Sequence, residues 1–191
     1  MNILLISGII SLIGILFIPN IYAQNTEWKI YTDSEKGFTI DYSSEWKVEL
    51  KENRFDSGDV DFIKKESTIL GDRTLIEENT AIVAIVFGKH LGTDEIDPKD
   101  FANALSKRNQ FTFNQYREIE NNIDKYTIDG NPTYGFIATH YDNTGLSEQA
   151  QLQLVSFPEG KLFGVLYMTK KEDFYKYLPI VEQMIHSIKL R

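Results

Sequence analysis

Four residues in one segment carry side chains that could hold a divalent cation. His90, Asp94, Glu95 and Asp97 follow a long apolar stretch. Imidazole and carboxylate groups are ligands for zinc and manganese, so His90 and Asp94 are the candidate metal ligands of this chain. Their spacing matches no strong metal-binding motif, and Asp97 precedes Pro98 in the pattern of a helix N-cap and first turn. Helix capping is therefore the favoured interpretation of Asp97, and a bound cation is the alternative.

Other acidic and histidine residues give weaker metal signals. Residues 56–61, with the sequence DSGDVD, lack the alternating oxygen ligands and the final bidentate glutamate of a calcium loop, so we expect a solvated turn. His140 and Asp142 end a predicted strand and could act as ligands. His186 follows Glu182 by about one helical turn and is expected to form a helix-surface pair with it. Calcium, manganese or zinc is thus a possible ligand, and no cofactor is firmly indicated.

Residues for nucleophilic catalysis are not recognisable in the sequence. The chain has no cysteine. Ser147 lies in the sequence GLSEQ, which lacks the second glycine of a Gly-x-Ser-x-Gly elbow, and is expected in a turn or at a strand edge. The carboxylate pairs 77–78 and 94–95 are adjacent in sequence, so their side chains diverge and do not suit paired acid–base chemistry. We therefore predict that the protein is not an enzyme.

One predicted strand has an unusual polar face. Gln149, Gln151 and Gln153 alternate with the apolar residues at 150, 152 and 154. Alternating residues of a strand lie on opposite faces, so the three glutamines share one face. We expect that face to meet solvent or the edge of a helix, and it is a candidate binding surface.

The apolar pattern predicts strands before and after a helix along the chain. Residues 38–42 and 46–50 alternate as half-buried antiparallel strands, whereas 81–87 are apolar on both faces, as in a central strand covered on each side. Four more strands are expected around 123–128, 133–141, 147–157 and 161–168. Short turn sequences separate these four, so they are expected to pair as an antiparallel meander.

Two helices are predicted to cover this sheet. One begins at Asp97-Pro98. The other begins at the capping box 169–172, continues through apolar positions to Ile188, and is kinked or restarted at Pro179. The predicted fold class is α+β: an antiparallel sheet flanked by helices on both faces.

The first residues have the features of an export signal. Residues 1–23 contain no charged side chain, and residues 3–18 are almost wholly apolar before Pro19. A helix of this stretch spans about 24 Å, less than the hydrocarbon core of about 30 Å, which favours a signal peptide cleaved after Ala23. The alternative is an uncleaved membrane anchor extending through Ala23. In both cases the leader contacts the membrane, and residues 24–191 form one exported domain, either extracellular or at the outer face of the cytoplasmic membrane.

The charge of the chain argues against nucleic acid as a partner. It has 28 acidic and 20 basic residues and a formal net charge of −8. A surface that follows phosphates needs a stripe of Lys and Arg, which an acidic chain of this kind does not suggest. The acidic surface suits solubility or cations instead.

Three stretches resemble the PsbP family, which comprises the extrinsic lumenal subunit of photosystem II and its relatives. Residues 37–46 (GFTIDYSSEW) resemble the opening motif of that family, although the family usually has proline where Ser43 stands. Residues 130–136 (GNPTYGF) and 177–188 are similar to two later family segments. The resemblance implies a PsbP-like domain over residues 24–191, with an antiparallel sheet between helices. No functional residue is carried over, and the acidic charge departs from the basic docking surface of the photosystem subunit.

These observations lead to one functional hypothesis and one alternative. The first is a non-catalytic extracytoplasmic PsbP-like module, an accessory or assembly factor that binds a protein partner in a membrane complex at the outer membrane face. The alternative is a protein that binds a divalent metal or a small ligand.

Overall fold

The computed structural model describes residues 26–51, 59–69, 75–90, 97–142 and 144–191. The leader, residues 1–23, and the metal candidate Asp94 lie outside these residues. In the described ranges, no helix combines the length and apolar character needed to cross a membrane.

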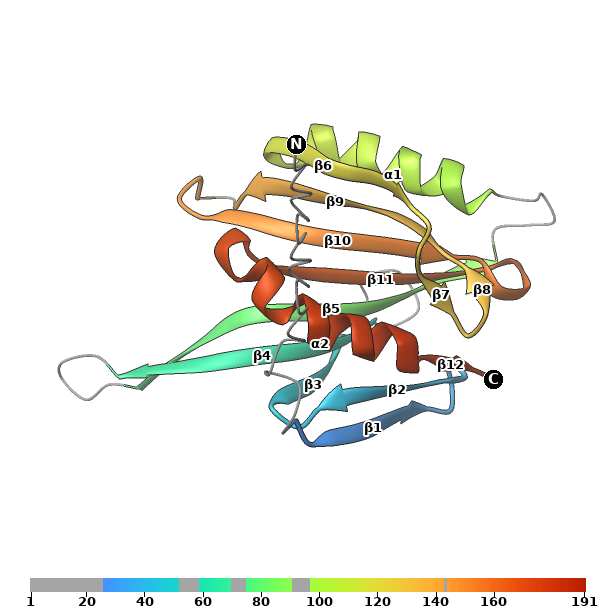
Figure 1. The fold of residues 1–191 in the computed structure, drawn as a ribbon, viewed down its shortest axis with the longest axis horizontal. Coiled ribbons are helices and arrows are strands. Elements are labelled where there is room, and N and C mark those ends of the chain that lie inside the picture. The colour runs from blue at the N-terminus through green and yellow to red at the C-terminus, as the bar shows by residue number, and fades with distance from the viewer. Residues whose placement is uncertain (1–25, 52–58, 70–74, 91–96, 143) are drawn as a thin grey trace, which may run out of the picture.

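A seven-stranded antiparallel sheet forms the centre of the molecule (Figure 1). Its strands, in spatial order, are β3 (Trp46–Lys51), β4 (Asp59–Ile69), β5 (Leu75–His90), β11 (Lys161–Lys170), β10 (Glu148–Ser156), β9 (Tyr134–Tyr141) and β6 (Asn114–Ile123). Strands β9, β10 and β11 pair with their sequence neighbours, which confirms the meander over these three segments. The apolar stretch 81–87 lies in β5, which is an interior strand, as its sequence predicts.

Two small sheets accompany the large one. Strand β2 (Phe38–Ser43) pairs with β1 (Trp28–Asp33) and with β12 (Lys189–Leu190). Strands β7 (Thr127–Ile128) and β8 (Asn131–Pro132) form a short hairpin. Its two turn residues, Asp129 and Gly130, have φ angles of 49° and 80°. Both therefore occupy the left-handed region, as a two-residue hairpin turn of type I′ requires.

The first helix begins as the sequence predicts. Helix α1 (Pro98–Thr112) has Asp97 as its N-cap, and the Asp97 Oδ1 accepts a hydrogen bond from the Lys99 amide at 2.8 Å. This bond satisfies one of the free amides of the first turn. Helix α1 packs mainly along β6, β9 and β10.

The second helix begins later than predicted. Thr169 and Lys170 belong to β11, the 3₁₀ turn Lys171–Asp173 follows, and α2 spans Phe174–Ser187. The capping-box prediction is wrong because Thr169 continues the alternation of β11 and is buried there. Pro179 lies inside α2, which runs through it as one helix.

The predicted layer of helices on both faces of the sheet is also wrong. The described residues are mostly strand and contain only two α-helices, so a large antiparallel sheet dominates the fold. Because residues 81–87 are apolar on both faces of their strand, helices were expected to cover each face. Val83 and Ile85 are fully buried with α2, but Ile82 and Val86 on the other face are only half-buried, because α1 packs over β6, β9 and β10 instead of β5.

Two strands of the large sheet were not expected from the sequence. Strand β4 begins at Asp59, so the predicted solvated turn at 56–61 is wrong for its described part, and Asp61 is buried in the sheet. Strand β6 occupies 114–123, where no strand was predicted, and its pairing with β9 shifts register three times. Both segments are rich in polar residues, which hides the apolar alternation on which strand prediction depends.

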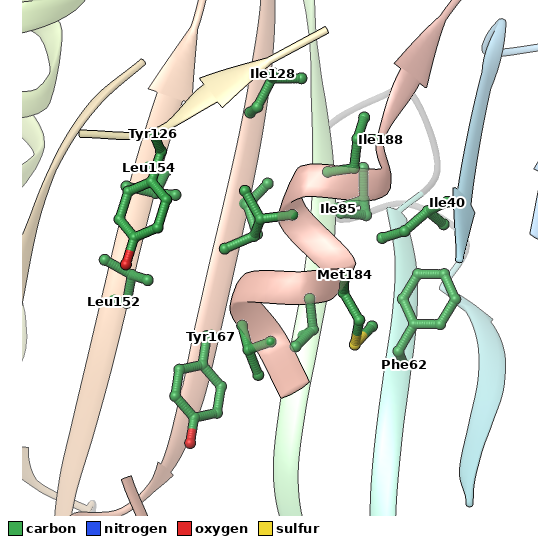
Figure 2. Close-up of a cluster of buried hydrophobic side chains, with 14 of the residues drawn as sticks. Ile40, Phe62, Ile85, Tyr126, Ile128, Leu152, Leu154, Tyr167, Met184 and Ile188 are labelled. Atoms are coloured by element: carbon green, nitrogen blue, oxygen red, sulfur yellow. The ribbon is translucent and has the colours of Figure 1, made fainter. Parts of the chain in front are cut away.

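The main core lies between α2 and the large sheet (Figure 2). Met184 of α2 and Ile188, which directly follows the helix, belong to one cluster with Ile40 of β2 and the sheet residues Ile85 and Leu152, and all five side chains are buried. Full burial of a side chain of this size contributes about 1.5–3 kcal/mol. Tyr167 of β11 is fully buried as well, and its hydroxyl donates to the Phe174 carbonyl at 2.9 Å.

Replacing Tyr167 with phenylalanine tests this buried hydrogen bond. Tyr167→Phe leaves the packing nearly unchanged but removes the donor to the Phe174 carbonyl, so we expect the free energy of unfolding to fall by about 1 kcal/mol. The measurement is urea unfolding followed by circular dichroism. Tyr175→Phe is the matched control, because the Tyr175 side chain is 70% exposed. Equal stability of the two variants would contradict the assigned role of the Tyr167 hydroxyl.

Candidate partner-binding surface

Three large, exposed side chains with extensive apolar surface lie at one end of the large sheet. Phe111 is 92% exposed, Leu146 is 88% exposed and Tyr175 is 70% exposed. They come from the last turn of α1, the β9–β10 turn and the first turn of α2. The strand register brings these elements to the same end, where β6 starts, β9 ends, β10 starts and β11 ends (Figure 1). We call Phe111, Leu146 and Tyr175 the turn-end surface.

A compact set of hydrogen bonds stabilises the β9–β10 turn that carries Leu146. The Asp142 Oδ1 accepts from the Leu146 amide at 3.2 Å and from the Thr144 amide and hydroxyl at 3.1 and 2.7 Å. The Asp142 amide donates to the Ser147 carbonyl at 2.9 Å, which closes the loop. These bonds, with that from the Thr144 hydroxyl first, lower the pKa of Asp142 because they stabilise its charged form. The backbone at Leu146 is therefore held by the turn.

The end of α1 fixes Phe111. The Phe113 amide donates to the Asn109 carbonyl at 2.9 Å as the helix ends. The Phe113 ring then packs on the His140 ring, with centroids 4.2 Å apart. His140 is buried in β9, so this contact attaches the last turn of α1 to the sheet.

The start of α2 is attached in a similar way. The Phe174 ring stacks on Tyr167 of β11 with centroids 5.0 Å apart. Tyr175 lies edge-on to Phe174 at 5.2 Å and points away from the core, as its exposure shows. The turn-end surface is thus made of exposed side chains whose neighbours in sequence are anchored in the sheet.

Glu148 connects the elements that carry this surface. Its carboxylate lies 2.8 Å from the Lys171 Nζ and 3.9 Å from an Arg117 guanidinium nitrogen. The Lys171 hydrogen bond is the main cause that lowers the pKa of Glu148. One residue at the start of β10 therefore has charged partners on β6 and on the turn before α2.

Only part of the segment with the predicted metal ligands lies within the described residues. His90 ends β5, and Asp94 falls outside the described ranges. Asp97 caps α1, in accordance with the favoured interpretation. Within the described residues, no group of three His, Asp or Glu side chains is placed to hold a metal ion.

The remaining candidates occupy other positions. His186 is exposed on α2, and its ring lies 6.1 Å from that of Tyr126, whereas Glu182 accepts a hydrogen bond from the Tyr126 hydroxyl at 2.6 Å. Ser147 lies in the turn before β10 and accepts from the Gln149 Nε2 at 2.9 Å.

The glutamine face of β10 meets α1. The Asn109 Nδ2 of α1 donates to the Gln153 Oε1 at 3.3 Å, so the expected helix edge is present. Gln151 is only 2% exposed, and solvent exposure was therefore the wrong expectation for this residue. Its Nε2 and the His140 Nδ1 are buried without a hydrogen-bond partner in the described part of the chain. Burial is the main cause that lowers the pKa of His140.

Sequence reasoning missed the turn-end surface as a unit. The segment Asp142–Gly145 was predicted as a turn, and its composition shows the Asp that accepts the loop amides. The exposure of Phe111 and Tyr175 depends on which helix faces meet the sheet. The placement of the three elements at one end of the sheet depends on strand register, which no local pattern specifies.

Comparisons with known proteins identify the fold. No protein-family model matches the chain, and no curated protein matches it. The solved structure of PsbP (CyanoP) from Synechocystis is similar with a TM-score of 0.59 at 14% identity, covering 88% of this chain and 95% of that protein. LpqN of Mycobacterium tuberculosis, involved in cell envelope biogenesis, gives 0.52 at 11% identity, covering 89% and 94%. The Ran-binding protein Mog1p of Saccharomyces cerevisiae gives 0.54 at 7% identity, covering 87% and 96%.

These similarities confirm the PsbP-like fold that the sequence motifs suggested. At such low identities they establish the fold alone.

The acid sensitivity of the β9–β10 turn is a testable consequence of the Asp142 hydrogen bonds. The hydrogen bonds hold the pKa of Asp142 below its ordinary value in the folded protein, so its contribution to stability is present at neutral pH and is lost as the pH falls through the lowered pKa. We expect the Asp142→Ala variant to have a lower melting temperature than the parent protein at pH 7. The difference between the two melting temperatures should be smaller at pH 2. Calorimetry at both pH values measures this. A difference that is the same at pH 2 and pH 7 would contradict the ionised role of Asp142.

Proposed function

We propose that residues 24–191 act as a non-catalytic extracytoplasmic module that binds a protein partner, as an accessory or assembly component of a membrane complex at its outer face. The observation that carries this proposal is the turn-end surface. Three large side chains from separate elements expose apolar area at one end of the molecule while their backbones are held by hydrogen bonds and ring contacts. Burying such side chains against a partner removes apolar area from water, which favours association.

The rigid presentation of these side chains supports binding. Ordering a loop or side chain during association costs free energy, and a surface that is already ordered avoids much of that cost. Aromatic side chains are also among the residue types that are enriched at protein interfaces.

The surroundings of the surface carry both signs of charge. Asp142, Glu172 and Asp173 lie near Leu146 and Tyr175 in the sequence, and Lys170, Lys171 and Lys176 lie in the same stretch. Anionic membrane surfaces attract clusters of basic residues, whereas acidic residues are interspersed with the basic ones here. The partner that suits this surface is therefore a protein with an apolar patch and charged residues of both signs around it.

Two further observations agree with the proposed location and role. The leader has the composition of an export signal, and LpqN, a protein of similar fold, is involved in cell envelope biogenesis. Mog1p, another protein of similar fold, is Ran-binding, so the fold is compatible with a binding role.

Site-specific photo-cross-linking tests the proposal. A photoreactive amino acid is placed at Phe111, Leu146 or, as a control, Ile30, which is 72% exposed on β1. The full-length chain carrying each label is irradiated in intact cells of its source organism. We expect one shared protein adduct from positions 111 and 146, absent from position 30, and identified by mass spectrometry in the membrane fraction.

A binding measurement with the identified protein completes this test. The double variant F111S/L146S should bind it at least roughly tenfold more weakly, as expected for the loss of two apolar contacts. The matched control I30S/L50S changes two exposed residues on β1 and β3 and should bind normally. Adducts that do not differ between the three positions, or equal binding by the two double variants, would refute the proposal.

A further inference from the structure

A cavity of about 260 Å³ lies at the opposite end of the sheet. Strand β11 runs between the two ends: Lys170 is paired with Gln149 near the turn-end surface, and Lys161 lines the cavity. The other walls come from the β1–β2 turn, the end of β5, the β7–β8 hairpin and the residues after α2, which meet on the right of Figure 1.

Basic side chains line this cavity. Lys36, Lys161 and Arg191 come from three separate parts of the chain. None of the three has an ion-pair partner among the residues that the structure describes. In a chain with a net charge of −8, three unpaired cations at one cavity are a local reversal of charge.

The acidic residues of the cavity do not cancel this positive charge. The Asp129 carboxylate lies 3.3 Å from the Lys189 Nζ and accepts the Leu190 amide at 3.0 Å. These contacts lower the pKa of Asp129, with the Leu190 hydrogen bond as the largest cause. Asp129 is thus already paired, and Glu159 is the acidic side chain that remains against three basic ones.

Two phenylalanine rings form an apolar wall. Phe87 and Phe163 pack edge to face with centroids 5.0 Å apart, and both line the cavity. The Lys36 Nζ lies 5.8 Å from the centre of the Phe87 ring, so a cation is held next to the aromatic surface. Leu162 and Leu190 add further apolar area.

A close backbone approach brings residues 37 and 191 together at this cavity. The Arg191 amide donates to the Gly37 carbonyl at 2.7 Å. Gly37 has a φ of 73°, and a Cβ at this position would lie 3.0 Å from the Arg191 carbonyl oxygen. A side chain is therefore disfavoured at position 37, and the absence of one keeps Lys36 and Arg191 at the same cavity.

From this arrangement we infer that the cavity binds a small organic anion, a carboxylate attached to an apolar body, with the carboxylate near Lys36, Lys161 and Arg191 and the body against Phe87 and Phe163. Inorganic phosphate suits the cavity less well, because the aromatic wall removes water from the ion without replacing its hydrogen bonds. The volume lies below the roughly 300–1,000 Å³ of sites for drug-sized ligands, so the ligand is small.

Titration of the full-length chain with sodium benzoate, followed by two-dimensional NMR, tests this inference. We expect benzoate to shift the backbone amide signals of Phe87, Lys161 and Leu162 with millimolar affinity. Benzamide has the same shape without the charge and should bind at least roughly fivefold more weakly, as should benzoate to the variant K36Q/K161Q. The control variant K99Q/K107Q changes two exposed lysines of α1 and should bind benzoate normally.

Three results would overturn the inference. The first is that the cavity amides do not shift at about 20 mM benzoate, a concentration well above a millimolar dissociation constant. The second is that benzamide or inorganic phosphate produces the same shifts as benzoate. The third is that K36Q/K161Q and K99Q/K107Q, both shown to be folded by circular dichroism, bind benzoate equally.

Discussion

Helix α2 lies between the large sheet and β2, and its buried residues contact both. Val181, Met184 and Ile185 are fully buried there, and the Trp46 and Tyr177 rings meet edge to face at 6.5 Å. The Ser187 hydroxyl accepts the Asp41 amide at 2.8 Å, which joins the end of the helix to β2. The removal of this apolar area from water is the main favourable contribution to such an arrangement.

Both ends of the molecule depend on this helix. Its first turn carries Tyr175 at the turn-end surface, and its last turn leads into β12 and Arg191 at the cavity. A change that displaced α2 would therefore alter both surfaces. A change at either surface, by contrast, leaves the buried side of α2 intact. This asymmetry makes the two ends suitable for independent study by substitution.

The parts of the fold that sequence could predict are those determined locally. Asp97 caps α1 because its carboxylate accepts the Lys99 amide and Pro98 suits the first helical position, which are both local properties of the sequence. Position 169 shows the limit of such reasoning. The residues Thr169–Glu172 match the sequence pattern of a capping box. Thr169 nevertheless pairs with Ala81 and Ala150 on the neighbouring strands, so the ladder of β11 determines its conformation. Tertiary pairing prevails over a local helix signal here.

The candidate surfaces were less predictable, for a related reason. The glutamines of β10 predict a face that meets solvent or the edge of a helix. Gln151 is buried because α1 and the neighbouring strands approach this part of the sheet. The cavity unites Lys36, Lys161 and Arg191, which are distant in sequence and carry no shared motif. Only the order of the strands brings such residues together.

The irregular pairing of β6 with β9 has a consequence for assembly. Strand β6 is one of the two outer strands of the large sheet, and its ladder is interrupted at three places. A regular outer strand offers a continuous row of amides and carbonyls that can recruit a strand from another molecule, whereas bulges and charged residues prevent this. The exposed Arg117 and Glu120 add charge along the same border. Growth of the sheet from one copy into the next is thereby discouraged at this border.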